Sequence, residues 1–458
     1  MLRKIGLHWW ILAGVLAGAL LGCALFFAHR EGARQAVLGD EYTRAQVMEH
    51  APEIQEALVQ SLEQTAVYQA FDGISRIFLN LLKMIVVPLV FFSLASGVAG
   101  IGDVSRLGRI GARTLGLYVG TSLLACVTGL AMVNLIRPGV GIDLPLPAVR
   151  EPAEVPESFW EVLVNMVPTN PVAAMADPNL GQLIGVILFT LLFGIFLLLI
   201  DKEKRDPMVG FIEAGAAVMM RMTRFIIALA PIGIAALIAR MVSTTGPEIF
   251  VSMIRYVVTV LLTLGIHALV TLPLLIYLFT RRNPYRYLAA MSPALLTAFS
   301  TASSSGTLAV TMERAEKGGG VSNSIASFTL PLGSTINMDG TALYEVVSVL
   351  FIAQLHAAVD PTFTLTFGQQ LLIVFLGLMV SIGAAGIPHA GLVMMVIILQ
   401  AVGLPVEYTA LIWTVDRFLD MCRTSVNVES DAAIALIVAH KENELDESVL
   451  FARPRAAA

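Results

Sequence analysis

The chain has 458 residues, of which 57% are hydrophobic and 14% are charged, and its mean hydropathy is +0.79. Soluble domains are about 45–50% apolar and about 25% charged, so this composition excludes an ordinary soluble protein. The net charge is −5 and there is no basic block, which argues against a nucleic-acid partner. Cys23, Cys126 and Cys422 lie far apart inside apolar stretches, so they predict neither a metal site nor a disulfide framework.

Long apolar segments follow one another along the chain, most of them long enough for a helix to cross the hydrocarbon core of a bilayer. The first is longer than the hydrophobic region of a signal peptide, and we interpret it as a spanning helix. The segments cover approximately residues 7–28, 72–99, 110–136, 179–200, 209–243, 250–280, 322–356 and 403–440. The sequence therefore predicts an integral membrane protein built of spanning helices.

Two further apolar segments, around 285–312 and 362–400, are interrupted by small and polar residues. The interruptions read Ser-Thr-Ala-Ser-Ser-Ser-Gly at 300–306 and Ser-Ile-Gly-Ala-Ala-Gly-Ile-Pro at 381–388. Non-helical backbone at membrane depth occurs only inside protein or beside a water-filled cavity. Paired interrupted segments of this kind indicate a transporter binding site, so we predict two re-entrant hairpins whose tips meet near mid-membrane. Two kinked spanning helices are the alternative.

The charges between the segments predict the orientation. Arginine and lysine gather before the first segment and after the second, fourth and sixth, and such residues concentrate on the cytoplasmic side. Both chain ends are then cytoplasmic, and the acidic loops 29–71 and 137–178 face outward as solvated surface without chemistry of their own.

The last apolar segment carries a polar stripe. At about 100° per residue, its polar side chains fall within a sector roughly 100° wide. A charge at the bilayer centre costs at least about 2.5–3.5 kcal/mol, so the stripe must face a cavity, a partner or an ion. An internal salt bridge between Asp420 and Arg423 is the structural alternative. The members are Asp416, Asp420, Arg423, Thr424, Asn427 and Asp431.

A second polar island, Gly-Ser-Thr-Ile-Asn-Met-Asp-Gly-Thr, occupies residues 333–341. Asn337, Asp339 and Thr341 offer oxygens for a small cation, and Gly333 and Gly340 allow the backbone to loosen. Helix N-termini at the hairpin tips suit a substrate carboxylate. Arg423 offers a planar fork for a second carboxylate, and Asp420 offers a negative charge to an ammonium group. Two sites for carboxylates and one for an ammonium group match the charged groups of aspartate or glutamate.

At these residues the sequence resembles the excitatory amino acid transporters, a family also called the dicarboxylate/amino acid:cation symporters. The resemblance covers nearly the whole chain, with the blocks in family order. They are Ser-Ser-Ser-Gly-Thr at 303–307, Asn-Met-Asp-Gly-Thr at 337–341, Ala-Gly-Ile-Pro at 385–388, Asp-Met-Cys-Arg-Thr-Ser-Val-Asn at 420–427 and, earlier, Met-Val-Pro-Thr-Asn-Pro at 166–171.

The resemblance implies an all-α membrane protein with eight transmembrane helices, two re-entrant hairpins, inverted repeats and a homotrimeric assembly. Residues 1–109 and 137–245 would form a scaffold domain with helices one, two, four and five. Residues 110–136 and 246–440 would form a transport domain with helix three, helix six, the hairpins and the last two helices, and 441–458 a cytoplasmic tail.

The resemblance also implies roles in substrate binding. Arg423 would bind the side-chain carboxylate with Thr341 and Gly391, and Asp420 would bind the amino group with Thr424. The main-chain carboxylate would be held by Ser304, Asn427 and the backbone at Ile387.

Three sodium sites are implied as well. The first would use Gly333, Asn337, Asn427 and Asp431. The second would use backbone oxygens of Thr335, Ser381, Ile382 and Ala384. The third would use Tyr118, Thr121, Ser122, Asn337 and Asp339, and the spacing of the first three places them on one helical face.

The chain departs from the family pattern at one point. Archaeal members have an arginine where Ala302 stands, and vertebrate glutamate transporters have one where Met421 stands, so potassium counter-transport is not implied here. Glu345 matches the proton-coupled vertebrate members, and a buried glutamate can carry a proton or be satisfied by local hydrogen bonds.

The leading hypothesis is sodium-coupled uptake of aspartate or glutamate across the plasma (inner) membrane, by a non-enzymatic symporter with an elevator-type movement. Arg423 argues against neutral amino acids, and Asp420 argues against C4-dicarboxylates. Proton-coupled symport of glutamate and aspartate or of C4-dicarboxylates is the alternative. An intramembrane aspartyl protease using Asp339 is a different hypothesis, but it leaves Arg423 and the hairpins unexplained. A channel is a third hypothesis, but a binding site with this many charges favours binding of a substrate over free flow.

Overall fold

The computed structural model describes residues 7–40, 42–43, 46–47, 50–99, 109–141, 164, 167–176, 180–247, 249–359, 363–382 and 389–451. Every regular element among these residues is a helix, and a single antiparallel bridge joins Val321 to Leu445. The chain is therefore all-α, as its sequence predicts.

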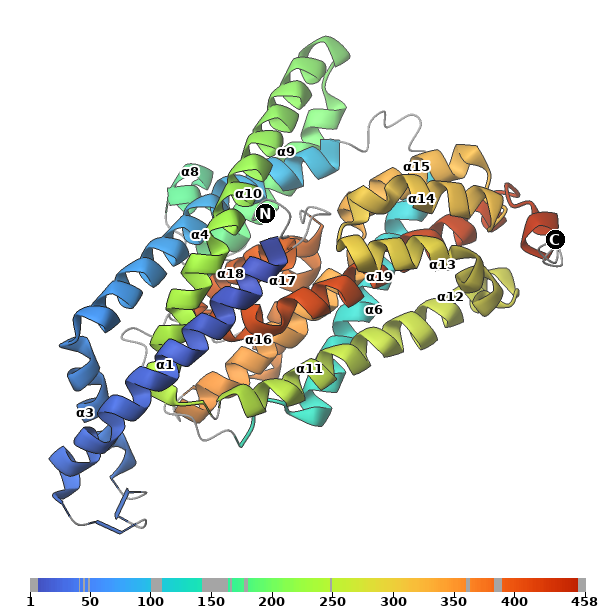
Figure 1. Ribbon diagram of the computed structural model, residues 1–458. Coiled ribbons are helices and arrows are strands. Elements are labelled where there is room, and N and C mark those ends of the chain that lie inside the picture. Colours follow the sequence, from blue (N-terminus) through green and yellow to red (C-terminus); the bar gives the residue numbers. More distant parts are fainter. Residues whose placement is uncertain are drawn as a thin grey trace, which may run out of the picture.

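The first group of helices packs around the long helix α10 (Figure 1). Helix α1 lies along α10, and its glycines at 14, 18 and 22 let the two backbones approach closely. A Cβ on Gly14 would lie 2.2 Å from the carbonyl oxygen of Pro231, and one on Gly18 would lie 2.4 Å from that of Ala235. Small residues at a spacing of four are typical of tight helix pairs in membranes. The members are α1 (Leu7–Leu38), α3 (Ala51–Glu63), α4 (Ala66–Ala99), α8 (Pro171–Ala176), α9 (Leu180–Leu199) and α10 (Lys202–Thr245).

The second group packs around α16 and α19 and contains the interrupted elements. Helices α13 and α14 form hairpin one, and α17 and α18 form hairpin two. The members are α6 (Arg109–Ile136), α11 (Ile249–Ile266), the π-helical turn η2 (His267–Thr271), α12 (Leu272–Thr280), α13 (Pro284–Thr301), α14 (Ser304–Lys317), α15 (Asn323–Ile336), α16 (Asp339–Val359), α17 (Phe367–Ser381), α18 (Ala390–Ala401), the short 3-10 turn η3 (Val406–Tyr408), α19 (Thr409–Lys441) and α20 (Glu447–Phe451).

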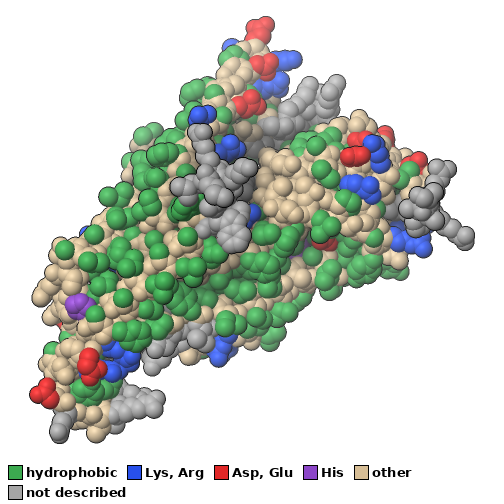
Figure 2. Space-filling view, in the orientation of Figure 1, with side chains coloured by type: hydrophobic (Ala, Val, Ile, Leu, Met, Phe, Trp, Pro, Cys, Tyr) green, Lys and Arg blue, Asp and Glu red, His purple; other side chains and the backbone are tan. Residues whose placement is uncertain are grey.

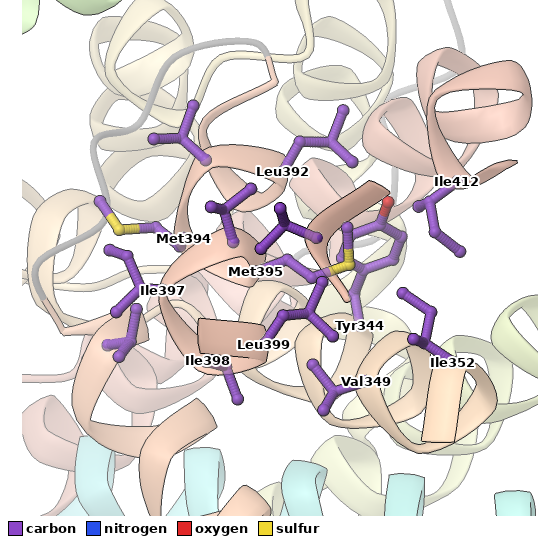
Figure 3. Packing of buried hydrophobic residues seen from close by; sticks show 14 of the residues in the cluster. Tyr344, Val349, Ile352, Leu392, Met394, Met395, Ile397, Ile398, Leu399 and Ile412 are labelled. Atoms are coloured by element: carbon purple, nitrogen blue, oxygen red, sulfur yellow. The ribbon is translucent and has the colours of Figure 1, made fainter. Parts of the chain in front are cut away.

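The largest apolar core extends from α1, α4 and α10 through α6 and α11 to α16, α17, α18 and the start of α19. Leu392, Met395 and Leu399 of α18 point toward Tyr344 and Ile352 of α16 (Figure 3). This core fixes hairpin two against the two helices that carry the polar stripes.

Six described helical segments are long and apolar enough to cross a membrane. Hydrophobic side chains cover the middle of the face in Figure 2, and charged side chains gather at its ends. The other two predicted spans differ, because α9 offers only Gly185–Leu199 as a described apolar stretch and α19 carries charges along one side. The six are Trp10–Leu38, Ala66–Ser96, Ile110–Ile136, Lys202–Thr244, Met253–Thr280 and Asn323–Ala358.

The structure corrects two predicted boundaries. The first helix continues to Leu38, and α3 occupies much of the acidic segment 29–71, which is therefore largely helical rather than a loop. The segment 322–356 is two helices, since α15 ends at Ile336 and α16 begins at Asp339. Neither Gly333 nor Gly340 lies at this break, which falls at Asn337 and Met338.

Candidate binding site for substrate and cations

The break between α15 and α16 faces the polar side of α19. Gly333 and Gly340 permit this approach: a Cβ on Gly333 would lie 2.4 Å from Asp431 Oδ1, and one on Gly340 would lie 2.5 Å from the carbonyl oxygen of Arg423. The two glycines, one on each side of the break, therefore make room for α19.

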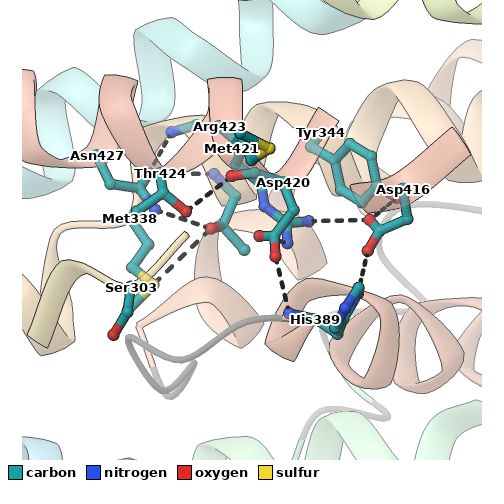
Figure 4. Close-up of polar contacts among 12 residues, drawn as sticks. Ser303, Met338, Tyr344, His389, Asp416, Asp420, Met421, Arg423, Thr424 and Asn427 are labelled. Carbon is teal, nitrogen blue, oxygen red and sulfur yellow. Dashed lines mark hydrogen bonds and ion pairs between the residues drawn. The ribbon is translucent and has the colours of Figure 1, made fainter. Parts of the chain in front are cut away.

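Arg423 is the centre of a buried charge cluster on α19 (Figure 4). Its side chain is 2% exposed and its guanidinium stacks 4.4 Å from the ring centroid of Tyr344. Nη2 donates to Asp420 Oδ1, and Nη1 lies 3.9 Å from Asp416 Oδ1. The predicted pair is thus an ion pair with a second carboxylate alongside it.

The polar groups around this cluster come from α16, α18 and α19. Gly391 lies directly against Arg423, because a Cβ there would be 2.3 Å from Nη1. Thr424 Oγ1 donates to the carbonyl oxygen of Asp420 at 2.8 Å. Thr341 Oγ1 accepts from Asn427 Nδ2 at 3.1 Å. These residues are all buried.

Hairpin one approaches the same part of α19. Ala302 adopts the left-handed conformation (φ +50°) in the turn, and the Ser303 hydroxyl caps α14 by accepting from the Gly306 amide at 3.1 Å. Ser304, the first residue of α14, is buried. Ile387 and Ala384 lie outside the described residues.

Asp339 is surrounded by donors from three other helices. Its Oδ1 accepts from Ser122 at 2.5 Å and from Thr121 at 3.3 Å. Its Oδ2 accepts from Ser430 at 2.6 Å and lies 3.1 Å from His267 Nε2. The structure thus brings α6, the π-helical turn, α16 and α19 together around one buried carboxylate.

Asn337 connects this carboxylate to Asp431. Its Nδ2 donates to Ser430 Oγ and to Asp431 Oδ1, both at 2.9 Å, and Thr121 Oγ1 lies 3.4 Å from its Oδ1. Tyr118 lies beside the same glycine as Asp431, since a Cβ on Gly333 would be 2.7 Å from its hydroxyl. That hydroxyl donates to the carbonyl oxygen of Thr329 at 2.7 Å.

The remaining described residues of the predicted cation sites lie at helix ends. Thr335 is exposed in the last turn of α15. Ser381 is the last residue of α17 and Ile382 its C-cap. Carbonyl groups at helix C-termini lack partners within the helix and can coordinate a cation.

Glu345 is fully buried on α16, one residue after Tyr344. Neither of its carboxyl oxygens has a hydrogen-bond partner among the described residues. The described residues therefore do not supply the local hydrogen bonds that were one of the two explanations for a buried glutamate at this position.

Four further polar residues of the site were not predicted from the sequence: His267, His389, Tyr344 and Ser430. His389 Nδ1 lies 2.7 Å from Asp416 Oδ2, and the Tyr344 hydroxyl donates to Asp416 Oδ1 at 2.7 Å. The sequence carried a weak signal for the histidines, which are single polar residues within or beside apolar runs. Arg417 is only partly buried and Met421 is half-buried, so Arg423 is the fully buried arginine of α19.

The chain is similar to known membrane transporters. The model of the sodium:dicarboxylate symporter family matches residues 7–441. The chain is 37% identical to the mouse excitatory amino acid transporter 3 over an alignment of 418 positions that covers 80% of this chain and 77% of that protein. It is 36% identical to the bovine neutral amino acid transporter B(0) over 80% of this chain and 72% of that protein.

A bacterial relative is similar at a comparable level. The proton/glutamate-aspartate symporter of Escherichia coli (strain K12) is 33% identical over an alignment of 389 positions that covers 83% of this chain and 87% of that protein. With these relatives and the match over nearly its whole length, the chain belongs to the sodium:dicarboxylate symporter family.

Proposed function

We propose that this chain is a sodium-coupled symporter of aspartate or glutamate. The buried pair of Arg423 and Asp420 carries this proposal. A buried ion pair is often no more stable than apolar packing, so its presence in a membrane helix favours a binding role. An acidic amino acid offers a carboxylate to Arg423 and an ammonium group to Asp420. The relatives include a glutamate-aspartate symporter and a neutral amino acid transporter by name, and Arg423 supports an acidic substrate.

The other proposed substrate contacts are those that the resemblance to the family implies. Arg423 would bind the side-chain carboxylate with Thr341 and with Gly391, which lies against its guanidinium. Asp420 would bind the ammonium group with Thr424, whose hydroxyl donates to the Asp420 carbonyl oxygen. Ser304 and Asn427, with the backbone at Ile387, take the main-chain carboxylate.

Three cation positions accompany the substrate. Asp339 with Tyr118, Thr121, Ser122 and Asn337 forms one, and Asp431 with Gly333, Asn337 and Asn427 forms another. Carboxylate, hydroxyl and carbonyl oxygens suit a small hard cation. The third uses carbonyl oxygens of Thr335, near the end of α15, and of Ser381 and Ile382, at the end of α17, together with that of Ala384.

Proton coupling is the second candidate function. Glu345 favours it, because a buried carboxyl without hydrogen-bond partners among the described residues is better tolerated when it carries a proton. The name of the Escherichia coli relative includes a proton. A proton on Glu345 is compatible with coupling to both sodium and protons and with coupling to protons alone.

The two groups of helices are proposed to act as separate bodies. Helices α1, α4, α9 and α10 form the scaffold of a homotrimer, and the group around α16 and α19 moves as the transport domain. Both termini lie on the cytoplasmic side of the plasma membrane.

Uptake by purified protein in lipid vesicles tests the function. Labelled aspartate is expected to accumulate under an inward sodium gradient at equal internal and external pH. Equal accumulation under a proton gradient alone, without sodium, would contradict sodium coupling and support the second candidate. No uptake of either acidic amino acid under any gradient would contradict both.

A further inference from the structure

His389 joins hairpin two to the charged side of α19. It precedes α18 in the left-handed conformation (φ +64°), and its backbone N–H donates to Asp420 Oδ2 at 2.9 Å. Its ring Nδ1 lies 2.7 Å from Asp416 Oδ2, and the ring stacks on Trp413 with 5.7 Å between centroids. The side chain is 5% exposed. One residue therefore contacts both carboxylates that flank Arg423.

Asp416 lies between His389 and Arg423 (Figure 4). Its Oδ2 is held by His389, and its Oδ1 accepts from the Tyr344 hydroxyl at 2.7 Å. Oδ1 is 3.9 Å from Arg423 Nη1, too far for a hydrogen bond. Asp416 is thus held about 1 Å short of a direct charge-assisted contact, which is about 2.7–2.9 Å long.

This separation leaves one edge of the guanidinium available. Nη2 is occupied by Asp420, and Nη1 has no hydrogen-bond partner among the described residues. If Asp416 closed onto Nη1, protein carboxylates would occupy both edges of the fork, and a substrate carboxylate would have to displace one. Tyr344 holds only the oxygen that faces Arg423, so His389 is the contact that pulls the carboxylate the other way.

We propose that His389 is a specificity-determining residue for acidic amino acids. It acts as a positioning residue: its ring N–H holds Asp416 away from Arg423, so that Nη1 stays available for the side-chain carboxylate of the substrate. This role rests on the proposed function.

Two variants at position 389 separate the hydrogen bond from the other contacts of the ring. Asparagine tolerates the left-handed backbone and carries an N–H donor near the position of Nδ1. Glycine tolerates this backbone too but has no donor. Both variants lose the stacking on Trp413, so they differ in the hydrogen bond to Asp416.

Binding of L-aspartate to the purified full-length chain at saturating sodium is the measurement. His389→Gly is expected to weaken binding about tenfold or more, and His389→Asn is expected to stay within about threefold of the wild type, because a hydrogen bond to a charged group is lost only in the first. In an Asp416→Asn background the glycine variant is expected to cost less than about twofold, since a neutral amide does not compete for Arg423.

The outcomes distinguish this role from the function on which it rests. Equal losses in the glycine and asparagine variants overturn the role of His389, as do wild-type binding by His389→Gly and equal losses with and without Asp416. A wild-type chain that binds neither aspartate nor glutamate overturns the proposed function and this role together. Thermal unfolding establishes that each variant is folded, and if Asp416→Asn does not fold, the glycine and asparagine pair alone decides.

Discussion

Gly391→Ala should weaken the binding of acidic amino acids without unfolding the chain. The new Cβ would lie 2.3 Å from Arg423 Nη1 and 2.8 Å from its Cζ. Ordinary contacts of a Cβ begin at 3.4 Å, so the guanidinium must move by roughly 1 Å. The clashing atoms are at the end of a long side chain, which can move more cheaply than a backbone. Hence we expect the fold to survive.

The size of the effect follows from the hydrogen bonds of the guanidinium. A shift of about 1 Å takes a contact of about 2.8 Å beyond hydrogen-bonding distance. Loss of one hydrogen bond to a charged group costs about 1.5–3 kcal/mol, which corresponds to binding weaker by about 10- to 150-fold.

Calorimetric titration of L-aspartate at saturating sodium measures this loss. Gly116→Ala on α6 is the matched control, because nothing lies within 4 Å of its added Cβ. It should bind as the wild type does, and both variants should unfold within a few degrees of it. Wild-type affinity in Gly391→Ala would refute the placement of Arg423 against the substrate carboxylate.

Four other substitutions test the site. Arg423→Cys should abolish uptake of acidic amino acids and admit neutral ones, and unchanged glutamate affinity would refute the role of Arg423. Asp420→Asn should weaken aspartate binding at least about tenfold, since an ionic contact to the ammonium group is lost, while the unfolding temperature changes little; retained binding would make the pair structural. Asp339→Asn should weaken sodium binding and lower the Hill coefficient for sodium in equilibrium titrations, and an unchanged sodium curve would contradict its role as a ligand. Glu345→Gln should remove the pH dependence of uptake at a fixed sodium gradient, because the amide cannot carry a proton; a dependence equal to that of the wild type would exclude Glu345 as the proton carrier.

Much of the fold was predictable because membrane helices must satisfy their backbone internally, which leaves a clear apolar signal. The boundaries in the acidic segment were not, because α3 (Ala51–Glu63) is polar enough to resemble solvated loop. Periodicity showed that Asp416, Asp420 and Arg423 share one face of α19. It could not show that Asp416 stops 3.9 Å from Arg423, because that distance depends on His389 and Tyr344 from other helices.

Glycine illustrates the same limit at the second polar island. Gly333 and Gly340 mark a place where the backbone is special, and the sequence alone suggested flexibility. The structure has a break in the helix between them, and it also shows crowding, with α19 against both residues. The sequence alone does not reveal this crowding, because the helix that causes it, α19, is about a hundred residues away in the chain.

The first turn of α16 is capped by a side chain from another helix. Asn427 Oδ1 accepts from the amides of Gly340 at 2.8 Å and Thr341 at 3.3 Å. In most helices the side chain of the N-cap residue accepts these hydrogen bonds. Any ligand that binds the side-chain oxygen of Asn427 therefore competes for that oxygen with the N-terminal amides of α16. Ligand exchange should then register as fraying of this turn, and the hydrogen-exchange rates of those two amides would rise or fall with the occupancy of a site on a different helix.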